Sequence, residues 1–294
     1  MDATVESFIE TVDGIPMGGL VARVENPRAV IVAMHGGAVS PHYFDAPGHP
    51  RHSLLRAGAA AGYTVIAPFR PGYGPSFEAL GDGVSPARQV DLAFEVIDRM
   101  TAAHGRGSGV FTVGHSIGCV LTMRMAADVR GAEWLGIELS GTGILHPSDV
   151  VARLPEEQVG TPRPLPRELA RELFWEPTEL YLDIPTVFSK LPRHETEDGA
   201  RWPALFPALA PHVAVPVRIS LAEHEKWWEA PPRGLASMAE LFTASPRVLT
   251  AEERGAGHNI SVGVTACDYH ARVLAFVDEC VPAREGAGRN EKVV

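Results

Sequence analysis

Short apolar runs alternate with helix-like segments along most of this 294-residue chain. Residues 29–34 form an unbroken apolar run, and mainly apolar runs follow at 64–67, 109–113 and 134–139. Runs of this length suit strands that are buried on both faces of a parallel sheet. Because helix-like segments separate the runs, the connections are expected to be right-handed crossovers. The pattern therefore predicts an α/β fold with a mostly parallel central sheet covered by helices on both faces.

The other expected elements flank or separate these runs. Two N-terminal strands are predicted at 5–10 and 20–24, and the turn signal Asp13-Gly14 lies between them. The alternation resumes near the C-terminus with further strands and helices. Helices are predicted at 54–61, from Pro86 through Met100, at 117–129, at 234–242 and at 267–280, and the late strands at 215–221 and 247–250.

The composition changes between residues 143 and 212, where prolines and aromatic residues are interspersed. Prolines are unsuited to central strands, whereas the aromatic residues argue against a disordered linker. We therefore expect a small, mainly helical cap (lid) subdomain at 143–212, with a long irregular loop as the alternative. The α/β core is then expected in two parts, 1–142 and 213–282, and the tail 283–294 is expected to be disordered.

Charge and cysteine content exclude several classes of protein. The formal net charge of −10 argues against nucleic acid and anionic membrane surfaces as partners. The three cysteines, Cys119, Cys267 and Cys280, are too few and too scattered for a disulfide framework or a zinc site, so no metal is expected. We expect neither a signal peptide nor a membrane span of roughly 18 apolar residues, and hence a cytoplasmic protein.

The strongest local signal is Gly114-His115-Ser116-Ile117-Gly118, which lies between a predicted buried strand and a predicted helix. A G-x-S-x-G motif in that context places the serine on a sharp strand-to-helix turn, where bulky neighbours two positions away would clash. The turn exposes the Ser116 hydroxyl and aims the Ile117 N–H at whatever the hydroxyl attacks. Ser116 is therefore the candidate nucleophile; the alternative is an ordinary exposed serine in a glycine-lined turn.

A serine hydroxyl is a weak nucleophile unless a base accepts its proton. His258 is the candidate base, because it lies in a glycine-rich loop between the last predicted strand and the last predicted helix. An orienting carboxylate is expected just beyond the strand 215–221, at the edge of the sheet that carries the nucleophile. Glu223 and Glu225 both follow that strand, and Asp149 is a third possibility.

Two more loops are expected at the same edge of the sheet. The loop from His35 to Ala38 leaves the first buried strand, and the N–H of Gly37 or Ala38 could join that of Ile117 in holding a developing oxyanion. The alternative is a plain tight turn. The loop that begins at Arg70 leaves the next strand, and its arginine is either structural or faces an acidic group of a substrate.

Taken together, these motifs resemble those of the α/β-hydrolase family over roughly residues 5–281. The resembling motifs, in family order, are the oxyanion loop His35-Gly36-Gly37, the PGxGxS-like turn Arg70-Pro71-Gly72-Tyr73-Gly74-Pro75-Ser76, the nucleophile elbow Gly114-His115-Ser116-Ile117-Gly118, and the acid and base segments Ala222-Glu223-His224-Glu225 and Gly257-His258. The family's acid usually follows a glutamate by two residues in a GExD pattern, so the resemblance implies Glu225, although aspartate and glycine are commoner there. The order Ser116, Glu225, His258 is the family order.

The resemblance implies an α/β-hydrolase fold with a helical cap that sets substrate choice. With the motifs, it predicts a serine hydrolase that cleaves an ester, thioester or lactone of a moderately bulky apolar substrate through an acyl-enzyme on Ser116. An alternative uses the same site for acyl transfer, C–C bond cleavage or elimination in bacterial secondary metabolism, and a third is a non-catalytic ligand-binding protein.

No cofactor is expected, and the expected partner is a small molecule or a carrier-bound acyl group. The oligomeric state stays open. The candidates for substrate contact are the polar or aromatic residues His35, Arg70, Tyr73, His115, Trp175, Phe188, Trp202 and Trp227.

Overall fold

The computed structural model describes residues 3–154, 165–184 and 188–282. Its strands are β1 Glu6–Val12, β2 Ile15–Ala22, β3 Val30–Met34, β4 Thr64–Pro68, β5 Val110–His115, β6 Gly136–Ser140, β7 Val217–His224 and β8 Val248–Gly257. They form one eight-stranded sheet in the order β1-β2-β4-β3-β5-β6-β7-β8. β2 pairs antiparallel with both β1 and β4, whereas all strands from β4 to β8 in this order run parallel.

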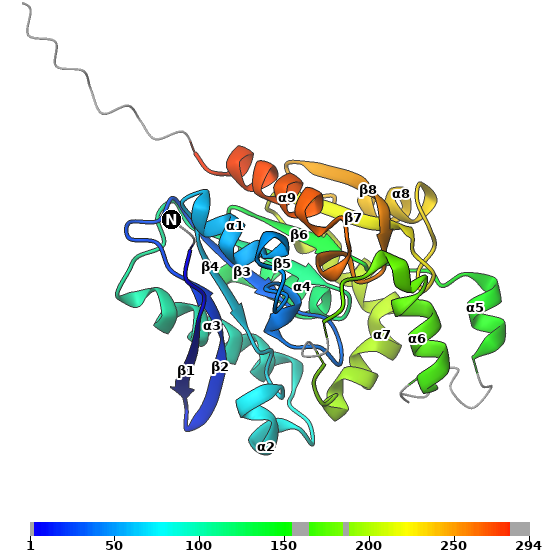
Figure 1. Cartoon of the computed structure of the whole chain (residues 1–294), viewed down its shortest axis with the longest axis horizontal. Helices are drawn as coiled ribbons and strands as arrows, with labels where there is room; N and C mark the ends of the chain where they lie inside the picture. Colours follow the sequence, from blue (N-terminus) through cyan, green and yellow to red (C-terminus); the bar gives the residue numbers. More distant parts are fainter. Residues whose placement is uncertain (1–2, 155–164, 185–187, 283–294) are drawn as a thin grey trace, which may run out of the picture.

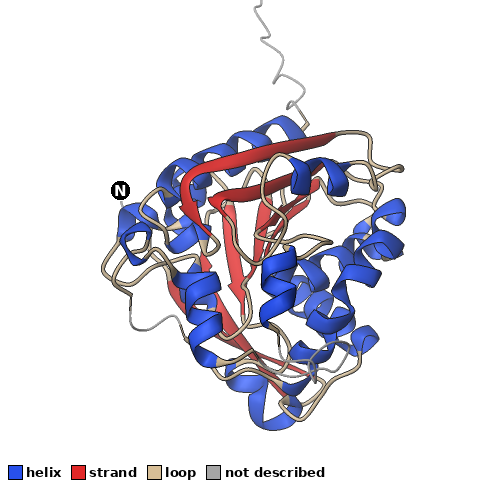
Figure 2. Ribbon diagram, turned by 90° about the vertical axis from the view of Figure 1, so that its right-hand side faces the viewer, coloured by secondary structure: helices blue, strands red, loops and turns tan. Residues whose placement is uncertain are grey.

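Helices lie on both sides of this sheet (Figures 1 and 2). They are α1 Leu54–Ala60, α2 Phe77–Leu80, α3 Pro86–Ala102, α4 Gly118–Ala126, α5 Ser148–Arg153, α6 Arg167–Trp175, α7 Arg193–Leu209, α8 Arg233–Ala239 and α9 Ala266–Cys280. One apolar cluster contains buried residues of α3, α4, α7 and α8, and a second contains those of α1 and α9. Within β3, Val32 belongs to the first cluster, and Ile31 and Ala33 to the second. This alternation buries both faces of the strand, so the predicted fold class is confirmed.

Local signals in the sequence account for several element boundaries. Asp13 and Gly14 both have positive φ, 49° and 80°, as a tight turn between β1 and β2 requires. The Ser85 hydroxyl accepts a hydrogen bond from the Arg88 N–H at 3.3 Å, and Pro86 occupies the first turn of α3. The turn and the helix start predicted from these residues are confirmed.

Two predicted strands had the wrong bounds. β2 begins directly after the turn, at Ile15, and not at residue 20. β8 continues beyond residue 250 to Gly257, because its pairing with β7 continues through Glu253. The sequence Ala251-Glu252-Glu253-Arg254 looks like a loop, but Glu253 is buried and its carboxylate accepts a hydrogen bond from Arg218 at 2.7 Å. Glu253 is thus a charged residue at a buried position of β8, and a search for apolar runs does not detect such a strand position.

The segment between β6 and β7 contains α5, α6 and α7, which lie together on the right of Figure 1. α7 packs against α4, and its Trp202 and Phe206 belong to the same buried cluster as the core helices. The division of the chain into a core and a cap at 143–212 stays a prediction. Parts of that segment, and the tail 283–294, lie outside the described residues.

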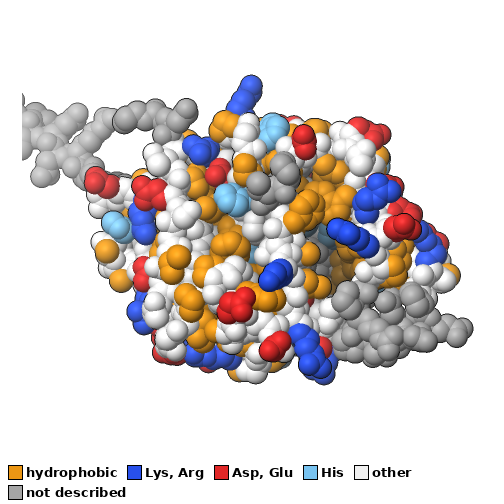
Figure 3. All heavy atoms as spheres, turned by 60° about the horizontal axis from the view of Figure 1, so that its bottom comes forward, with side chains coloured by type: hydrophobic (Ala, Val, Ile, Leu, Met, Phe, Trp, Pro, Cys, Tyr) orange, Lys and Arg blue, Asp and Glu red, His pale blue; other side chains and the backbone are white. Residues whose placement is uncertain are grey.

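Hydrophobic side chains gather around a hollow on the face drawn in Figure 3, on the side of the molecule that holds α5, α6 and α7 in Figure 1. Lys, Arg, Asp and Glu side chains surround this hollow on the same face. Across the described ranges, the helices are all too short or too polar to cross a membrane.

Candidate active site

The carboxyl ends of the parallel strands bring five chain segments to one edge of the sheet. The loop from His35 follows β3, the loop from Phe69 follows β4, Ser116 follows β5, and Glu225 directly follows β7. His258 comes after β8, whose last residue pairs with the end of β7. In open α/β sheets, ligands bind at this edge, beyond the carboxyl ends of the strands.

Ser116 occupies a strained turn between β5 and α4. Its φ is +52°, a left-handed conformation that side chains adopt only where the surrounding structure enforces it. A Cβ atom at Gly114 would lie 2.7 Å from Thr122 Oγ1, and one at Gly118 would lie 2.4 Å from the carbonyl oxygen of Met34. The two glycines therefore let the chain pass closely enough to hold the serine above the sheet edge.

The hydroxyl of Ser116 lies in line with a histidine and a carboxylate. His258 Nε2 is 3.0 Å from Ser116 Oγ. On the other side of the ring, Nδ1 lies 2.9 Å from Oε2 and 3.0 Å from Oε1 of Glu225. His258 and Glu225 are both buried, which strengthens the attraction between a protonated imidazole and the carboxylate.

The structure separates the three acids that the sequence offered. Glu225 Oε1 also accepts hydrogen bonds from the backbone N–H groups of Trp227, at 2.9 Å, and Trp228, at 3.3 Å, so its carboxylate is held on two sides. Glu223 is exposed, and its Oε2 accepts from the Gly255 N–H at 2.8 Å. Asp149 is exposed in the first turn of α5. Of the three, Glu225 is the one that meets the histidine.

The loop after β3 lies against the nucleophile. A Cβ atom on Gly36 would lie 3.3 Å from Ser116 Cβ, and one on Gly37 would lie 3.3 Å from Ile117 Cγ2. The Ala38 N–H donates to the hydroxyl of Tyr73 at 3.1 Å. Among the described residues, the N–H groups of Gly37 and Ile117 have no partner. The structure therefore favours Gly37 over Ala38 as the companion of Ile117, because the Ala38 donor is already engaged.

Three predicted substrate contacts lie in the neighbouring loops, and they stay predictions. His35, Arg70 and Tyr73 are buried and have protein partners. The guanidinium of Arg70 makes a bidentate ion pair with Glu195 of α7, at 2.5 and 2.8 Å. Burial, and then the charge of Arg70, lowers the pKa of His35 well below its usual value, so this ring is neutral.

His115 and Trp202, two further predicted contacts, are also buried and have protein partners. The His115 ring stacks on Tyr43 with centroids 4.5 Å apart. Its Nε2 lies 3.3 Å from Oδ1 of Asn259. Burial, and next the nearby His258, lowers the pKa of His115. Trp202 Nε1 donates to Thr142 Oγ1 at 2.8 Å. This hydrogen bond helps to hold α7 on the core, where the indole is buried.

Partly exposed aromatic side chains remain as candidate wall residues of the site. Trp227 directly follows the acid segment, and Trp175 lies 5.3 Å from Phe188 between ring centroids. Phe174 was not among the predicted contacts, yet its ring centroid is 4.8 Å from that of His258 and 5.7 Å from that of Trp227. Its place depends on how α6 folds back over the sheet edge, which a proline-rich segment does not reveal in sequence.

The Phe174 backbone is tied to the loop that carries the histidine. Asn259 Nδ2 donates to the Phe174 carbonyl at 2.8 Å, and Asn259 Oδ1 faces His115. Asn259 is not among the predicted site residues, although its position directly after the candidate base was a usable signal. Within residues 3–154, 165–184 and 188–282, no group of three or more His, Cys, Asp or Glu side chains is placed to hold a metal ion.

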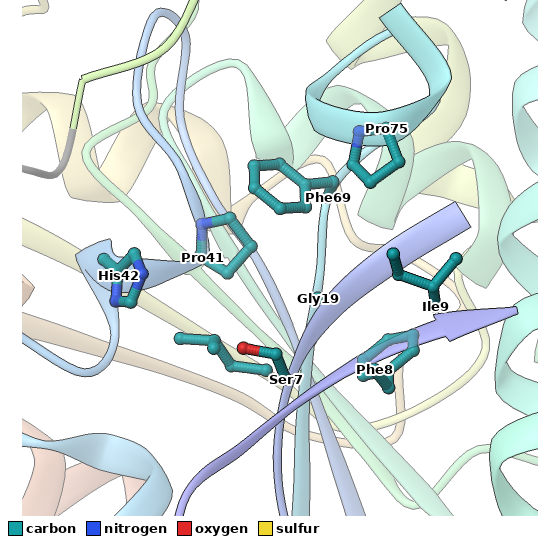
Figure 4. Close-up of a pocket in the computed structure, with 9 residues that line it drawn as sticks. Ser7, Phe8, Ile9, Gly19, Pro41, His42, Phe69 and Pro75 are labelled. Carbon is teal, nitrogen blue, oxygen red and sulfur yellow. The ribbon is translucent and has the colours of Figure 1, made fainter. Parts of the chain in front are cut away.

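A small apolar pocket of about 170 Å³ lies against β1 and β2, at one end of the strand order (Figure 4). It is lined from β1, β2 and the loops after β3 and β4, including Phe8, Ile9, Pro41, Phe69 and Pro75. Ser116 is not among the described residues that line it.

Comparisons with known proteins agree with this fold. A family model described as "Alpha/beta hydrolase family" matches residues 30–278. A monoglyceride lipase from Saccharomyces cerevisiae is 15% identical, with a TM-score of 0.71 over 95% of this chain and 96% of that one. A carboxyl esterase from Bacillus coagulans is 17% identical, with a TM-score of 0.66 over 96% and 100% of the two chains. A thioesterase domain from the curacin biosynthetic pathway is 15% identical, with a TM-score of 0.58 over 93% and 99%. At these identities the likeness concerns the fold, and the search of curated proteins found no match.

Proposed function

Because the chain belongs to the alpha/beta hydrolase family, we propose that it is a serine hydrolase acting on an ester, thioester or lactone of a moderately bulky apolar substrate. The match over residues 30–278 confirms the family resemblance that the motifs indicated. The observation that carries the proposal is the hydrogen-bonded line from Ser116 through His258 to Glu225, at 3.0 and 2.9 Å.

In the first half of the reaction, Ser116 Oγ attacks the acyl carbon while His258 Nε2 accepts the hydroxyl proton. Glu225 holds the Nδ1–H tautomer and stabilises the imidazolium that forms. The imidazolium then donates its proton to the leaving alcohol or thiol, and an acyl-enzyme remains on Ser116. Ser116 and Glu225 lie at opposite ring nitrogens of His258. Nε2 can therefore accept and donate the proton while Nδ1 stays hydrogen-bonded to the carboxylate.

Negative charge develops on the acyl oxygen during the attack. The N–H groups of Gly37 and Ile117 are the proposed donors, since Gly37 lies against Ile117, the residue directly after the nucleophile. A donor of this kind is worth about 2.7–4 kcal/mol of barrier, because it points at the developing charge before the reaction begins.

In the second half, His258 removes a proton from a water molecule that attacks the acyl-enzyme. The tetrahedral intermediate collapses, the imidazolium returns the proton to Ser116 Oγ, and the carboxylic acid product leaves. The net reaction consumes one water and needs no redox partner.

We further propose that 143–212 acts as a cap that sets substrate choice. Phe174, within this segment, stands beside the candidate base and packs on Trp227, and such aromatic surfaces suit an apolar acyl or alcohol group. The similarity to a thioesterase domain makes thioesters a class worth testing beside esters. A cytoplasmic location, and the exclusion of nucleic acid and membranes as partners, stay predictions from composition.

The proposal is tested by comparing wild type with Ser116→Ala on p-nitrophenyl esters from acetate to octanoate and on an acyl thioester. We expect a loss of at least about 10³-fold in kcat with an unchanged circular dichroism spectrum. In heavy-oxygen water, the acid product of the wild type should carry the label, whereas acyl transfer or elimination leaves it unlabelled. Full activity in Ser116→Ala contradicts the serine mechanism.

A further inference from the structure

A buried carboxylate from α7 reaches the loop that carries the proposed oxyanion donor. Glu195 Oε1 accepts from Arg70 Nη1 at 2.5 Å, and Glu195 Oε2 accepts from Arg70 Nη2 at 2.8 Å and from the Tyr73 hydroxyl at 2.9 Å. Glu195 lies at the first turn of α7, whereas Arg70 and Tyr73 belong to the loop after β4. One side chain thus joins the segment between β6 and β7 to the core.

The two partners of Glu195, Arg70 and Tyr73, also form hydrogen bonds with the backbone of the loop after β3. Arg70 donates from Nε to the His35 carbonyl at 2.6 Å and from Nη2 to the Gly36 carbonyl at 3.0 Å. The Tyr73 hydroxyl accepts from the Ala38 N–H at 3.1 Å. The backbone groups on both sides of Gly37 are therefore held, and the Gly37 N–H lies between them.

The network resists rearrangement because it is buried and each of its three side chains makes at least two hydrogen bonds. Arg70 is 2% exposed and Glu195 is 4% exposed, so water cannot replace a lost partner cheaply. A bidentate pair with a carboxylate fixes the plane of a guanidinium, and with it the direction of the N–H groups that point elsewhere. Burial, and then the charge of Glu195, raises the pKa of Tyr73, so the hydroxyl keeps its proton and donates to Glu195.

We propose that Glu195 is a positioning residue for the oxyanion site. It orients Arg70 and Tyr73, and these two side chains hold the peptide groups around Gly37 where the acyl oxygen becomes negative. The oxyanion site is then complete only when α7 is docked on the core. This inference rests on the proposed serine hydrolase function.

The same helix supplies a matched control. Asp198, one turn after Glu195, accepts from Arg124 Nη2 at 2.7 Å and from Nη1 at 3.0 Å, and it is also buried. Its partners belong to α4 and, through Gln89 at 3.4 Å, to α3, and none of these contacts reaches the loop after β3. A variant of Asp198 therefore changes a buried carboxylate of the same helix and leaves in place the Glu195 contacts that hold the loop around Gly37.

The experiment compares Glu195→Gln with Asp198→Asn on p-nitrophenyl butyrate, with melting temperature measured for each. For Glu195→Gln, we expect kcat to fall by about 10- to 100-fold with KM within about twofold, because a small misplacement of a donor acts on the transition state. Affinity for an aryl boronic acid, whose tetrahedral adduct places an oxygen at the donors, should fall by a similar factor. Glu195→Asp should recover part of the loss, and Asp198→Asn should keep kcat and boronate affinity within about twofold.

Tyr73→Phe keeps the proposal testable if Glu195→Gln does not fold. This variant removes only the hydroxyl between Glu195 and the Ala38 N–H, and kcat is expected to fall by about threefold to tenfold with KM unchanged. Wild-type kcat in folded Glu195→Gln, or in Tyr73→Phe, overturns the inference, as does an equal loss in Asp198→Asn. Those outcomes leave the proposed function intact if a fluorophosphonate still labels wild-type Ser116; an unlabelled wild type defeats the proposed function itself.

Discussion

Two glutamates two positions apart have different environments at the end of β7. Glu225 is buried against His258 and two backbone N–H groups, whereas Glu223 is exposed and accepts from Gly255 of the neighbouring strand. Glu225 can therefore hold the imidazole tautomer, and Glu223 supports the pairing of β7 with β8. Sequence alone allowed either residue, because both follow the same strand.

Exchanging each carboxylate for an amide separates the two roles. We expect Glu225→Gln to lower kcat on p-nitrophenyl butyrate by about 10²- to 10⁴-fold, because the amide can stabilise the wrong tautomer and cannot balance the imidazolium. Glu223→Gln should stay within about twofold of wild type. Steady-state kinetics of the two variants decide the assignment, and a larger loss in Glu223→Gln would reverse it.

At the scale of elements, the approach of α4 to β3 determines where Ser116 can stand. A Cβ on Gly118 would meet the carbonyl oxygens of Met34 and His35 at 2.4 and 2.5 Å, and backbone atoms cannot move aside individually. Gly199 in α7 is different, since the nearest atom to its Cβ would be Ile117 Cδ1 at 3.8 Å. Substituting glycine with alanine is therefore expected to destabilise the protein at residue 118 in α4 and to stabilise it at residue 199 in α7.

We expect Gly118→Ala to destabilise the fold by several kcal/mol or to prevent folding, because α4 must move away from β3. Gly199→Ala should raise the free energy of unfolding by about 0.5–1 kcal/mol, because alanine is the better helix former. Urea denaturation of both variants tests this pair. Equal stability of the two would show that the close contact at residue 118 is not limiting.

α9 carries a buried histidine whose protonation opposes folding. Burial, and then the proximity of His52, lowers the pKa of His270 to about 3. Among the described residues, neither ring nitrogen of His270 has a hydrogen-bond partner. An unfolded histidine has a pKa near 6.5, so the unfolded chain binds one more proton here between about pH 6.5 and pH 3. Stability from this residue is present above that window and is lost as the pH falls through it.

Replacing His270 with leucine removes this proton uptake at similar side-chain volume. We expect the free energy of unfolding of His270→Leu to fall less steeply than that of wild type between pH 6.5 and 4, by up to about 1.4 kcal/mol per pH unit. Urea titrations at several pH values give the two slopes. Parallel slopes would mean that His270 titrates normally in the fold.

Across the whole molecule, the sequence predicted best those residues whose positions depend on strand ends. Ser116, Glu225 and His258 directly follow β5, β7 and β8, and parallel strands bring such positions to one edge whatever the rest of the chain does. The predicted strands 109–113, 215–221 and 247–250 precede the same three residues in the same order, although the last of them was predicted to end too early. Glu195 and Phe174 belong to the segment between β6 and β7, which folds back over this edge. The pattern of apolar residues along that segment does not predict which core residues it contacts.

The partners of Arg70 and Trp202 could not be predicted for the same physical reason. Arg70 was assigned by its chemistry and its loop, but a buried carboxylate from α7 satisfies it. Trp202 was assigned by its aromatic character, but an indole can equally fill a core and donate to a neighbouring hydroxyl, as it does with Thr142. Residue type and loop position indicate that a side chain has a binding partner. Only the packing shows whether that partner is another part of the protein.

The most direct test of the account is whether folded protein forms a covalent adduct on Ser116. Intact-mass spectrometry after exposure to a fluorophosphonate, followed by peptide mapping, measures this without knowledge of the substrate. We predict one adduct per chain, located on Ser116, absent from Ser116→Ala and abolished when the protein is unfolded in urea. Folded wild-type protein that stays unmodified, or an adduct that persists in Ser116→Ala, would contradict the proposed nucleophile.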